Sequence, residues 1–277
     1  MARATWCWRR WIIFDQQELW QERMQSVTGL TWSFTERPPR ARILLEAYTE
    51  KKSCADSLTR RWGGRTRAVK AAEWIQSRPA PPTRIGRKLE IIHGKSSAPM
   101  TAKVRRLHIP HGLAFGSGEH ATTFLLLRSL LEQDDWCGKA VLDLGTGSGV
   151  LAMAARLLGT RKIVALDFDP EAVRTSRENE ALNFPAPEIT WRCADVKRLK
   201  AASRYDLVLA NLFSGILAEA APQIAASVAV GGLLWMSGIL RTQQDEVTAA
   251  YLQQKLELVR AIRRGKWVML QWRKPAA

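Results

Sequence analysis

The sequence predicts an α/β protein in which a doubly wound parallel sheet follows a small α+β domain. Short apolar runs alternate with helical stretches through the second half of the chain, as in a parallel sheet whose strands are joined by helices. A glycine-rich turn directly follows the first of these runs. Residues 1–78 have the order strand, helix, strand, strand, helix, strand, which is the split βαβ order of a ferredoxin-like domain.

Composition and charge set the broad class. The chain has 277 residues, of which 46% are hydrophobic and 25% charged, and this composition excludes a wholly disordered protein. The formal net charge is +16, and residues 1–107 contribute +13 of it. Such a basic segment indicates an acidic or polyanionic partner, which is a protein surface or RNA.

Cysteine usage and hydropathy bear on the compartment. Four cysteines lie far apart with no histidine at ligand spacing, so the pattern supports neither a disulfide scaffold nor a metal site. Only four apolar residues follow Arg9 and Arg10, too few for the core of a signal peptide. Residues 220–240 carry no charge, but their proline and glycines favour a helix end, a turn and a buried strand over a membrane span. We expect a cytoplasmic monomer that makes no contact with membranes.

The first domain, residues 1–78, is expected to contain four strands and two helices. The strands are predicted at Thr5–Phe14, Thr31–Phe34, Arg42–Tyr48 and Ala68–Ile75, and the helices at Gln16–Val27 and Ser53–Trp62. Seven of the twelve tryptophans lie here, and we expect most of them to form its core; a stacking platform for nucleic acid is the alternative. The segment Ser77–Thr83, rich in proline, breaks periodic structure and ends the domain.

Residues 79–107 are predicted to be a linker with two short strands, and residues 108–277 to form the second domain. The linker strands are expected at Lys88–Ile92 and Val104–Ile109. The parallel strands of the second domain are expected at Val141–Leu144, Lys162–Leu166, Ile189–Cys193, Asp206–Leu209 and Leu233–Met236. A final hairpin, Leu256–Ile262 with Trp267–Trp272, is expected at the edge of this sheet.

The glycine-rich turn is typical of a nucleotide site. Gly145, Gly147 and Gly149 lack a Cβ where a backbone must approach a ligand, and the helix behind them begins with free N–H groups. Val150 stands where the dinucleotide fingerprint requires glycine or alanine, which disfavours a hydride-transfer enzyme. A tight turn without a ligand remains the alternative for this loop taken alone.

Two acids at later strand ends strengthen the nucleotide interpretation. Asp167 ends the next strand 22 residues after Gly145, where a carboxylate can accept hydrogen bonds from both hydroxyls of a ribose. Asp195 follows the third strand and is positioned to face an adenine amino group. Each acid alone could be a helix cap, as we expect for Asp169 before Pro170. Together with the loop they predict an adenosine ligand.

Three segments around this core resemble one enzyme family. Leu113–Thr123, with the sequence LAFGSGEHATT, is similar to the LAFGTGxHxTT segment of the ribosomal protein methyltransferase PrmA family. Asn211–Leu217 and Ser237–Leu240 resemble that family's NILAGxL and SGIL segments. The resemblance covers roughly Ile85 to the C-terminus, whereas the first 84 residues match by element order. It implies a Rossmann-like class I methyltransferase sheet.

The resemblance also implies a cofactor and an active site. The cofactor is S-adenosyl-L-methionine, with Thr123, Gly145, Asp167 and Asn211 as contacts and Phe115 as a cover or as a core residue. The product is a methylated amine on a protein. Asn211 can orient the incoming amine through its side-chain oxygen. His120 is the best candidate for a base, with a role in capping or packing its loop as an equal alternative.

The expected function is therefore methyl transfer to a lysine side chain or N-terminal amine of a protein, most simply a ribosomal protein docked by domain 1–78. One alternative is an RNA or DNA methyltransferase that uses the basic domain, although Asn211-Leu-Phe-Ser214 lacks the prolines usual in enzymes that methylate base nitrogens. A second alternative is an RNA-binding or assembly protein that retains only the fold. The intact glycines and Asp167 argue against it.

Overall fold

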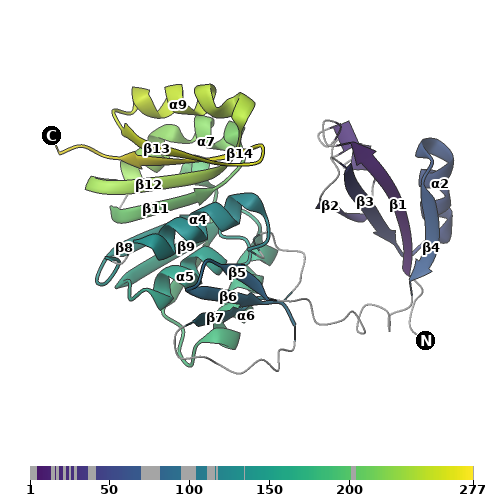
Figure 1. Ribbon diagram of the computed structural model, residues 1–277, viewed down its shortest axis with the longest axis horizontal. Coiled ribbons are helices and arrows are strands. Elements are labelled where there is room, and N and C mark those ends of the chain that lie inside the picture. Colours follow the sequence, from purple (N-terminus) through teal and green to yellow (C-terminus); the bar gives the residue numbers. More distant parts are fainter. Residues whose placement is uncertain are drawn as a thin grey trace. The chain divides into compact units, whose positions relative to one another are not determined.

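The structure is a computed structural model that divides into two compact units, Met1–Arg78 and Pro79–Ala277 (Figure 1). It describes residues 5–13, 16, 19–20, 23–24, 26–27, 30–36, 42–69, 82–94, 104–110, 116, 118–133, 135–200 and 204–276.

The N-terminal unit contains a four-stranded antiparallel sheet with the order β2-β3-β1-β4. Its elements are β1 (Thr5–Ile13), β2 (Thr31–Glu36), β3 (Arg42–Thr49), α2 (Lys52–Trp62) and β4 (Arg65–Val69). This strand order is the one that the split βαβ pattern produces, with the first and third strands at the centre. Of the helix predicted at Gln16–Val27, the described residues Leu19, Trp20, Arg23 and Met24 are α-helical, Gln16 is in a 3₁₀ turn, and Ser26 and Val27 lie in a turn and a bend.

Tryptophans form much of the core of this unit. Trp8 is fully buried and Trp20 is 3% exposed, and both pack with aliphatic residues of β1 and β3. The prediction that most tryptophans are core residues is confirmed for these two, whereas Trp11 is 50% exposed and Trp74 lies outside the described residues. Trp8 Nε1 donates to the carbonyl of Gly63 at 2.8 Å and so fixes the end of α2 against β1.

The last strand of this sheet differs from its prediction. β4 begins at Arg65, three residues before the predicted start at Ala68, and the predicted part beyond Val69 lies outside the described residues. Only Val69 is buried in this strand, because β4 is an edge strand that pairs with β1 alone. A polar edge strand lacks the apolar alternation by which strands are found in a sequence.

The second unit contains the predicted doubly wound sheet, with the order β10-β9-β8-β11-β12-β14-β13. Its strands are β8 (Ala140–Leu144), β9 (Lys162–Asp167), β10 (Ile189–Cys193), β11 (Tyr205–Asn211), β12 (Val228–Leu240), β13 (Glu257–Arg264) and β14 (Trp267–Arg273). The first five are parallel, and the β13–β14 hairpin adds to β12 in antiparallel register. β12 starts five residues earlier than predicted, because its pairing with β11 begins at Val228.

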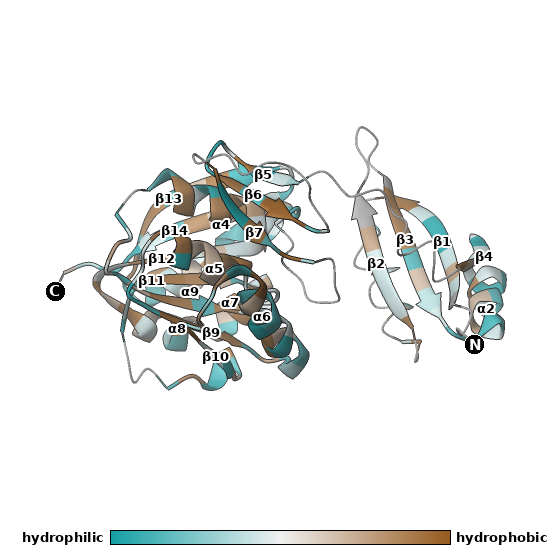
Figure 2. Ribbon diagram, turned by 90° about the horizontal axis from the view of Figure 1, so that it is seen from below, coloured by the Kyte–Doolittle hydropathy of each residue, from teal (hydrophilic) through white to brown (hydrophobic). Residues whose placement is uncertain are grey.

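Helices cover both faces of this sheet and make a three-layer structure (Figures 1 and 2). One face packs against α4 (Ala121–Glu132), α5 (Val150–Leu157) and α6 (Pro170–Asn183). The other face packs against α7 (Ser214–Glu219), α8 (Ala221–Ser227) and α9 (Gln244–Gln253), and the 3₁₀ turns η2 (Val196–Arg198) and η3 (Arg241–Gln243) lie between elements. Parallel strands buried on both sides explain the continuous apolar runs in the sequence.

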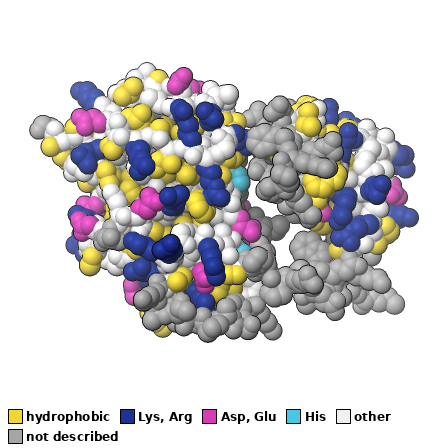
Figure 3. Space-filling model, viewed as in Figure 1, with side chains coloured by type: hydrophobic (Ala, Val, Ile, Leu, Met, Phe, Trp, Pro, Cys, Tyr) yellow, Lys and Arg dark blue, Asp and Glu magenta, His cyan; other side chains and the backbone are white. Residues whose placement is uncertain are grey.

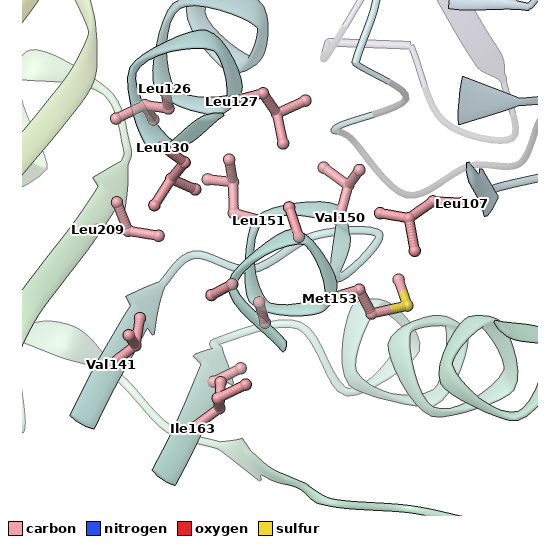
Figure 4. Packing of buried hydrophobic residues seen from close by; sticks show 14 of the residues in the cluster. Leu107, Leu126, Leu127, Leu130, Val141, Val150, Leu151, Met153, Ile163 and Leu209 are labelled. Carbon is pink, nitrogen blue, oxygen red and sulfur yellow. The ribbon is translucent and has the colours of Figure 1, made fainter. Parts of the chain in front are cut away.

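The helix behind the glycine-rich turn is held by its own apolar side chains. Figure 4 shows Leu151 of α5 among residues of α4 and of the sheet, with Val150 and Met153 near Leu107. All three α5 side chains are at least 97% buried. Burial of each such side chain contributes about 1.5–3 kcal/mol, so the position of α5, and of the loop before it, is strongly determined.

Residues 79–107 belong to the second unit. The two predicted strands are present as β6 (Leu89–Ile92) and β7 (Arg105–His108), and β5 (Thr83–Ile85), which was not predicted, pairs with β6. Their apolar side chains join the core under α4 and α5. Asn183 of α6 also accepts from the backbone N–H of His108 at 2.6 Å and donates to its carbonyl at 2.8 Å.

The boundary between the two units divides the basic charge of residues 1–107. Residues 1–78 hold fifteen basic and eight acidic residues, a net charge of +7, and residues 79–107 add +6. The basic excess before residue 108 is therefore shared between the two units rather than confined to the first.

The four cysteines are unpaired. Within the described ranges, no His, Cys, Asp or Glu side chains gather in a group that could hold a metal, and no helix is long and apolar enough to cross a membrane.

Candidate active site

The predicted site residues gather where the parallel strands end. Asp167 closes β9 and pairs with Cys193 at the end of β10, while Asn211 closes β11 beside Ser237 of β12. β8 lies between β9 and β11, and the glycine-rich loop follows it. Ligands of open α/β sheets bind outside this carboxyl edge, where the strand order reverses, and here it reverses at β8.

The backbone favours glycine at three positions of the loop, and close neighbours also require it at two of them. Gly145, Gly147 and Gly149 all have positive φ, between 55° and 82°. A Cβ on Gly145 would overlap the side chain of Leu212, and one on Gly149 would lie 2.7 Å from the ring of Trp191. The sequence interpretation, close approach to a ligand, thus omitted a second reason for glycine at these positions, the packing of the protein against itself.

Hydrogen bonds hold the loop in place. The backbone N–H groups of Gly145 and Thr146 both donate to the carbonyl of Leu166 in β9, at 2.9 and 3.0 Å. Ser176 of α6 donates to the carbonyl of Gly147 at 2.8 Å, and Asn179 donates to that of Ser148 at 2.9 Å. The loop is preorganised before any ligand arrives.

Asp167 is placed as a ribose-binding carboxylate would be. Its Oδ2 accepts from the N–H of Gly147 at 2.9 Å and its Oδ1 from the N–H of Asp169 at 3.0 Å. Each carboxylate oxygen accepts more than one hydrogen bond, so both can still receive a hydroxyl. Asp169 caps α6 through the N–H of Glu171 at 2.9 Å, and Pro170 follows in the first turn, as predicted.

Asp143 is a candidate that the sequence analysis did not single out. It lies within β8, is fully buried, and accepts the hydroxyl of Thr146 on Oδ2 at 2.6 Å, while Oδ1 has no hydrogen-bond partner among the described atoms. The pKa of this carboxyl is raised to about 7, chiefly by burial and to a smaller extent by the nearby Asp167, while the hydrogen bond from Thr146 opposes the rise. A charged residue inside an apolar strand directly before the loop was the available signal.

The segment that carried the resemblance contacts the glycine-rich loop. Ser148 donates to the carbonyl of Gly116 at 2.7 Å. Gly116 has a φ of 103°, and a Cβ there would lie 3.2 Å from the same Ser148 hydroxyl. Phe115, predicted to cover the cofactor, lies outside the described residues.

His120 caps the helix that follows this segment. It is the N-cap of α4, and its Nδ1 lies 2.8 Å from the hydroxyl of Thr122 and accepts from the Thr122 N–H at 3.4 Å. Its ring packs edge-on against Trp267, with centroids 5.0 Å apart. Burial, and secondarily Lys266, lowers the pKa of His120 to about 4, so the imidazole is neutral at pH 7. Of the two roles left open by the sequence, the structure displays the capping role.

Asn211 and Thr123, 88 positions apart, are brought into contact. Asn211 Nδ2 donates to the hydroxyl of Thr123 at 3.1 Å, which joins the end of β11 to the first turn of α4. Thr123 is buried, whereas Asn211 is half-buried and is followed by Phe213, which is 66% exposed. With Nδ2 engaged, Oδ1 of Asn211 is the atom that can accept a hydrogen bond from an amine.

Asp195 holds a local cap. Its Oδ1 accepts from the N–H of Lys197 at 2.9 Å, at the start of η2. The backbone beside it is tied to β9, because the N–H of Ala194 donates to the carbonyl of Asp167 at 2.9 Å. The two acids predicted to face the adenosine thus lie at the ends of adjacent strands.

Comparison with known proteins decides the family. The family model described as ribosomal protein L11 methyltransferase (PrmA) matches residues 8–275.

The chain belongs to the ribosomal protein L11 methyltransferase family.

Individual relatives agree with this assignment. The chain is 39% identical to the ribosomal protein L11 methyltransferase of Pelobacter propionicus over 75% of its own length and 69% of that protein's. It is 40% identical to that of Chromohalobacter salexigens over 74% and 66% of the two lengths. A ribosomal protein L11 methylase structure from Lactobacillus delbrueckii subsp. bulgaricus superimposes with a TM-score of 0.64 and 28% identity, over 70% of this chain and 99% of that one. The chain thus spans about two thirds of the length of these sequence relatives.

The cofactor of this family, S-adenosylmethionine, fits the described residues. Asp167 presents a half-buried carboxylate whose oxygens can each accept a further hydrogen bond, as two ribose hydroxyls require. Gly145, Gly147 and Gly149 have positive φ and carry no Cβ, so a ligand can approach their backbone closely. Beneath it, the buried Oδ1 of Asp143 has no partner among the described atoms and can receive an N–H or a bridging water. The residues present therefore suit an adenosine-containing cation.

Proposed function

We propose that this chain transfers a methyl group to an amine, on a lysine side chain or at the N-terminus, of ribosomal protein L11. The observation that carries the proposal is the Asn211–Thr123 contact at the carboxyl end of β11, next to the loop held by Asp167. It puts an amide able to orient an amine at the edge where the cofactor binds. The family match over residues 8–275 and the names of the relatives supply the substrate.

The chemistry divides between the cofactor and the chain. S-adenosylmethionine supplies an electrophilic methyl group on a sulfonium. Asp167 and the glycine-rich loop hold and orient this cofactor, with Asp195 toward its adenine. Asn211 Oδ1 accepts an N–H of the incoming amine and turns its lone pair toward the methyl group. Alignment of the two reacting atoms then contributes most of the rate enhancement.

The incoming amine must lose a proton before its lone pair can attack the methyl group. With a pKa of about 4 and a ring engaged with Thr122, His120 is a weak base at pH 7. We infer that His120 holds the start of α4 and that the lysine loses its proton to water before the amine binds. If His120 is the base, His120→Gln should lower turnover at neutral pH and recover it at high pH, where the free amine forms without a base. A capping role predicts instead a variant that keeps the pH dependence of the wild type.

We infer that the N-terminal unit docks the protein substrate. It folds around its own core, carries a net charge of +7 and contributes none of the site residues named above. Deletion of residues 1–78 should leave cofactor binding unchanged and abolish methylation of the protein. A truncated chain that methylates as fast as the full one would contradict this role. The same proposal expects a cytoplasmic protein that is a monomer. Sedimentation of the purified chain can check the monomeric state.

A direct assay tests the proposal. The purified chain is incubated with methyl-labelled S-adenosylmethionine and ribosomal protein L11, and mass spectrometry locates the label. Label on lysine or N-terminal nitrogen supports the proposal. In a parallel reaction with ribosomal RNA, label in the RNA and none in L11 would favour the alternative function, methylation of nucleic acid. In that case the basic charge of both units would attract the phosphates of the RNA.

A further inference from the structure

The N-terminal unit contains an open groove that the site described above does not use. Its volume is about 410 Å³, and it is lined by Arg10, Trp20, Arg23, Arg61, Trp62 and Gly63. Two indole rings form its base, Trp20 and Trp62, which meet edge to face at 5.7 Å and 81°. Both pack against the fully buried Trp8, at 6.2 and 6.5 Å between ring centroids. Because Trp8 belongs to the core and holds the two rings in place, the groove has a rigid floor.

The arginines of the groove are oriented by these rings. The guanidinium groups of Arg10 and Arg23 lie 5.1 and 4.8 Å from the centroid of Trp20, and that of Arg61 lies 4.8 Å from the centroid of Trp62. These are cation–π contacts, which use the charge of the guanidinium and none of its N–H donors. The three arginines therefore keep donors for a ligand while the rings limit their conformational freedom in advance of binding.

The charges of this groove are not matched by acids in the described part of the unit. The ion pair described there joins Arg9 to Glu46, and none is formed by Arg10, Arg23 or Arg61 with a described carboxylate. Arginine stays protonated at every physiological pH, so three positive charges share one groove. Trp20 is 3% exposed, and its Nε1 has no acceptor among the described atoms. Three guanidinium groups with no carboxylate partner among the described residues indicate an anionic ligand.

We propose that this groove binds the phosphate backbone of single-stranded RNA. Each phosphodiester presents two charged oxygens that suit the fork of a guanidinium, and successive phosphates of one strand can occupy successive arginines. A folded protein surface brings carboxylates singly and rarely three in a row. Figure 3 shows Lys and Arg side chains gathered over the α2 side of the unit, and the exposed Arg60 and Arg65 extend the positive surface beyond the groove. The proposal does not depend on methyl transfer.

The test measures RNA affinity of the full chain as a function of salt. Fluorescence anisotropy with a labelled oligouridylate of about 12 nucleotides gives the affinity between roughly 50 and 300 mM KCl. The test variant is Arg10→Gln/Arg23→Gln/Arg61→Gln. The matched control is Arg241→Gln/Arg260→Gln/Arg273→Gln, which removes the same charge from exposed positions of the other unit.

The two variants should separate the groove from general charge. We expect the groove variant to bind at least about tenfold more weakly and to lower the slope of log affinity against log salt by about 2, since each single-strand phosphate contact contributes about 0.7. The control should keep the wild-type slope. Arg61→Gln alone, on the exposed side of α2, should lower the slope by about 0.7 without any loss of folding.

Three results would overturn the proposal. One is a wild-type chain that does not bind the oligonucleotide. A second is a folded groove variant, verified by near-ultraviolet circular dichroism of its tryptophans, that binds RNA as tightly as the control. A third is oligoglutamate that displaces the RNA at equal concentration, which would identify a carboxylate ligand instead. The measurement uses neither cofactor nor protein substrate, so each of these results would leave the proposed methyl transfer untouched.

Discussion

The ribose-binding role of Asp167 can be tested by Asp167→Asn. The carboxylate oxygens already accept one backbone N–H each, from Gly147 and Asp169, at 2.9 and 3.0 Å. An amide in this position keeps one accepting oxygen and turns an NH₂ group toward either a backbone N–H or the ligand. The substitution therefore removes at least one charge-assisted hydrogen bond to a ribose hydroxyl while leaving the size of the side chain unchanged.

The magnitude follows from the type of bond that is lost. A hydrogen bond to a charged group contributes about 1.5–3 kcal/mol. We therefore expect the Kd for S-adenosylmethionine to rise roughly tenfold to 150-fold, at 1.4 kcal/mol per factor of ten. Isothermal titration calorimetry measures this directly, and the melting temperature without ligand reports the loss of the backbone contacts separately.

Asp206→Asn is the matched control. Asp206 also lies in a strand of the sheet and accepts a backbone N–H, that of Ala140, at 2.7 Å, but it is located at the amino end of β11, at the opposite edge. Its replacement should lower stability and leave Kd unchanged. A Kd for Asp167→Asn within twofold of wild type, or an equal weakening by Asp206→Asn, would refute the assignment of Asp167.

Three further predictions concern catalysis, pH and packing. Asn211→Ala should lower kcat at least about tenfold with less effect on cofactor Kd, since it removes the amine acceptor; wild-type turnover at saturating cofactor would make Asn211 structural. Asp143 has its pKa raised in the folded protein from 3.8 to about 7. Its contribution to stability is therefore full below pH 4 and is lost as pH rises through 7, so Asp143→Asn should reduce the fall in unfolding free energy between pH 5 and pH 8 in urea titrations. Gly149→Ala should lower the melting temperature and, because its Cβ would meet Trp191, weaken cofactor binding; an unchanged melting temperature would contradict this packing.

The sequence was most informative where local pattern and tertiary demand coincide. The parallel strands of the second unit are buried on both faces, so their apolar runs identified them in the sequence. The start of α6 was identified by Asp169 as the capping residue and by Pro170 in the first turn. The candidate site followed from the same strands, because their carboxyl ends must share one edge of the sheet. Asp167 was predicted from its position at a strand end, whereas Asn211 was implied by the family resemblance.

What the sequence did not supply depends on residues distant in the chain. β4 and β5 are short edge strands whose residues bear little apolar periodicity, and β12 extends back through Gly231 and Gly232 because β11 offers it backbone partners. Residues 79–107 were predicted to be a linker because their few apolar side chains are buried only by packing against α4 and α5, which come later in the chain. The role of Gly149 required knowing that Trp191 lies opposite.

Two hydrogen bonds tie the segment that contains Gly116 and Thr123 to both sides of the candidate active site. Ser148, inside the loop that faces the cofactor, bonds to the carbonyl of Gly116, and Thr123 a few residues later bonds to Asn211. A displacement of this segment must break a bond to the cofactor loop or to the strand end that faces the amine. We therefore expect occupancy of the two ligand sites to be energetically coupled. Such coupling is reciprocal: whatever factor the cofactor adds to the affinity for the protein substrate, that substrate returns to the cofactor, in either order of binding.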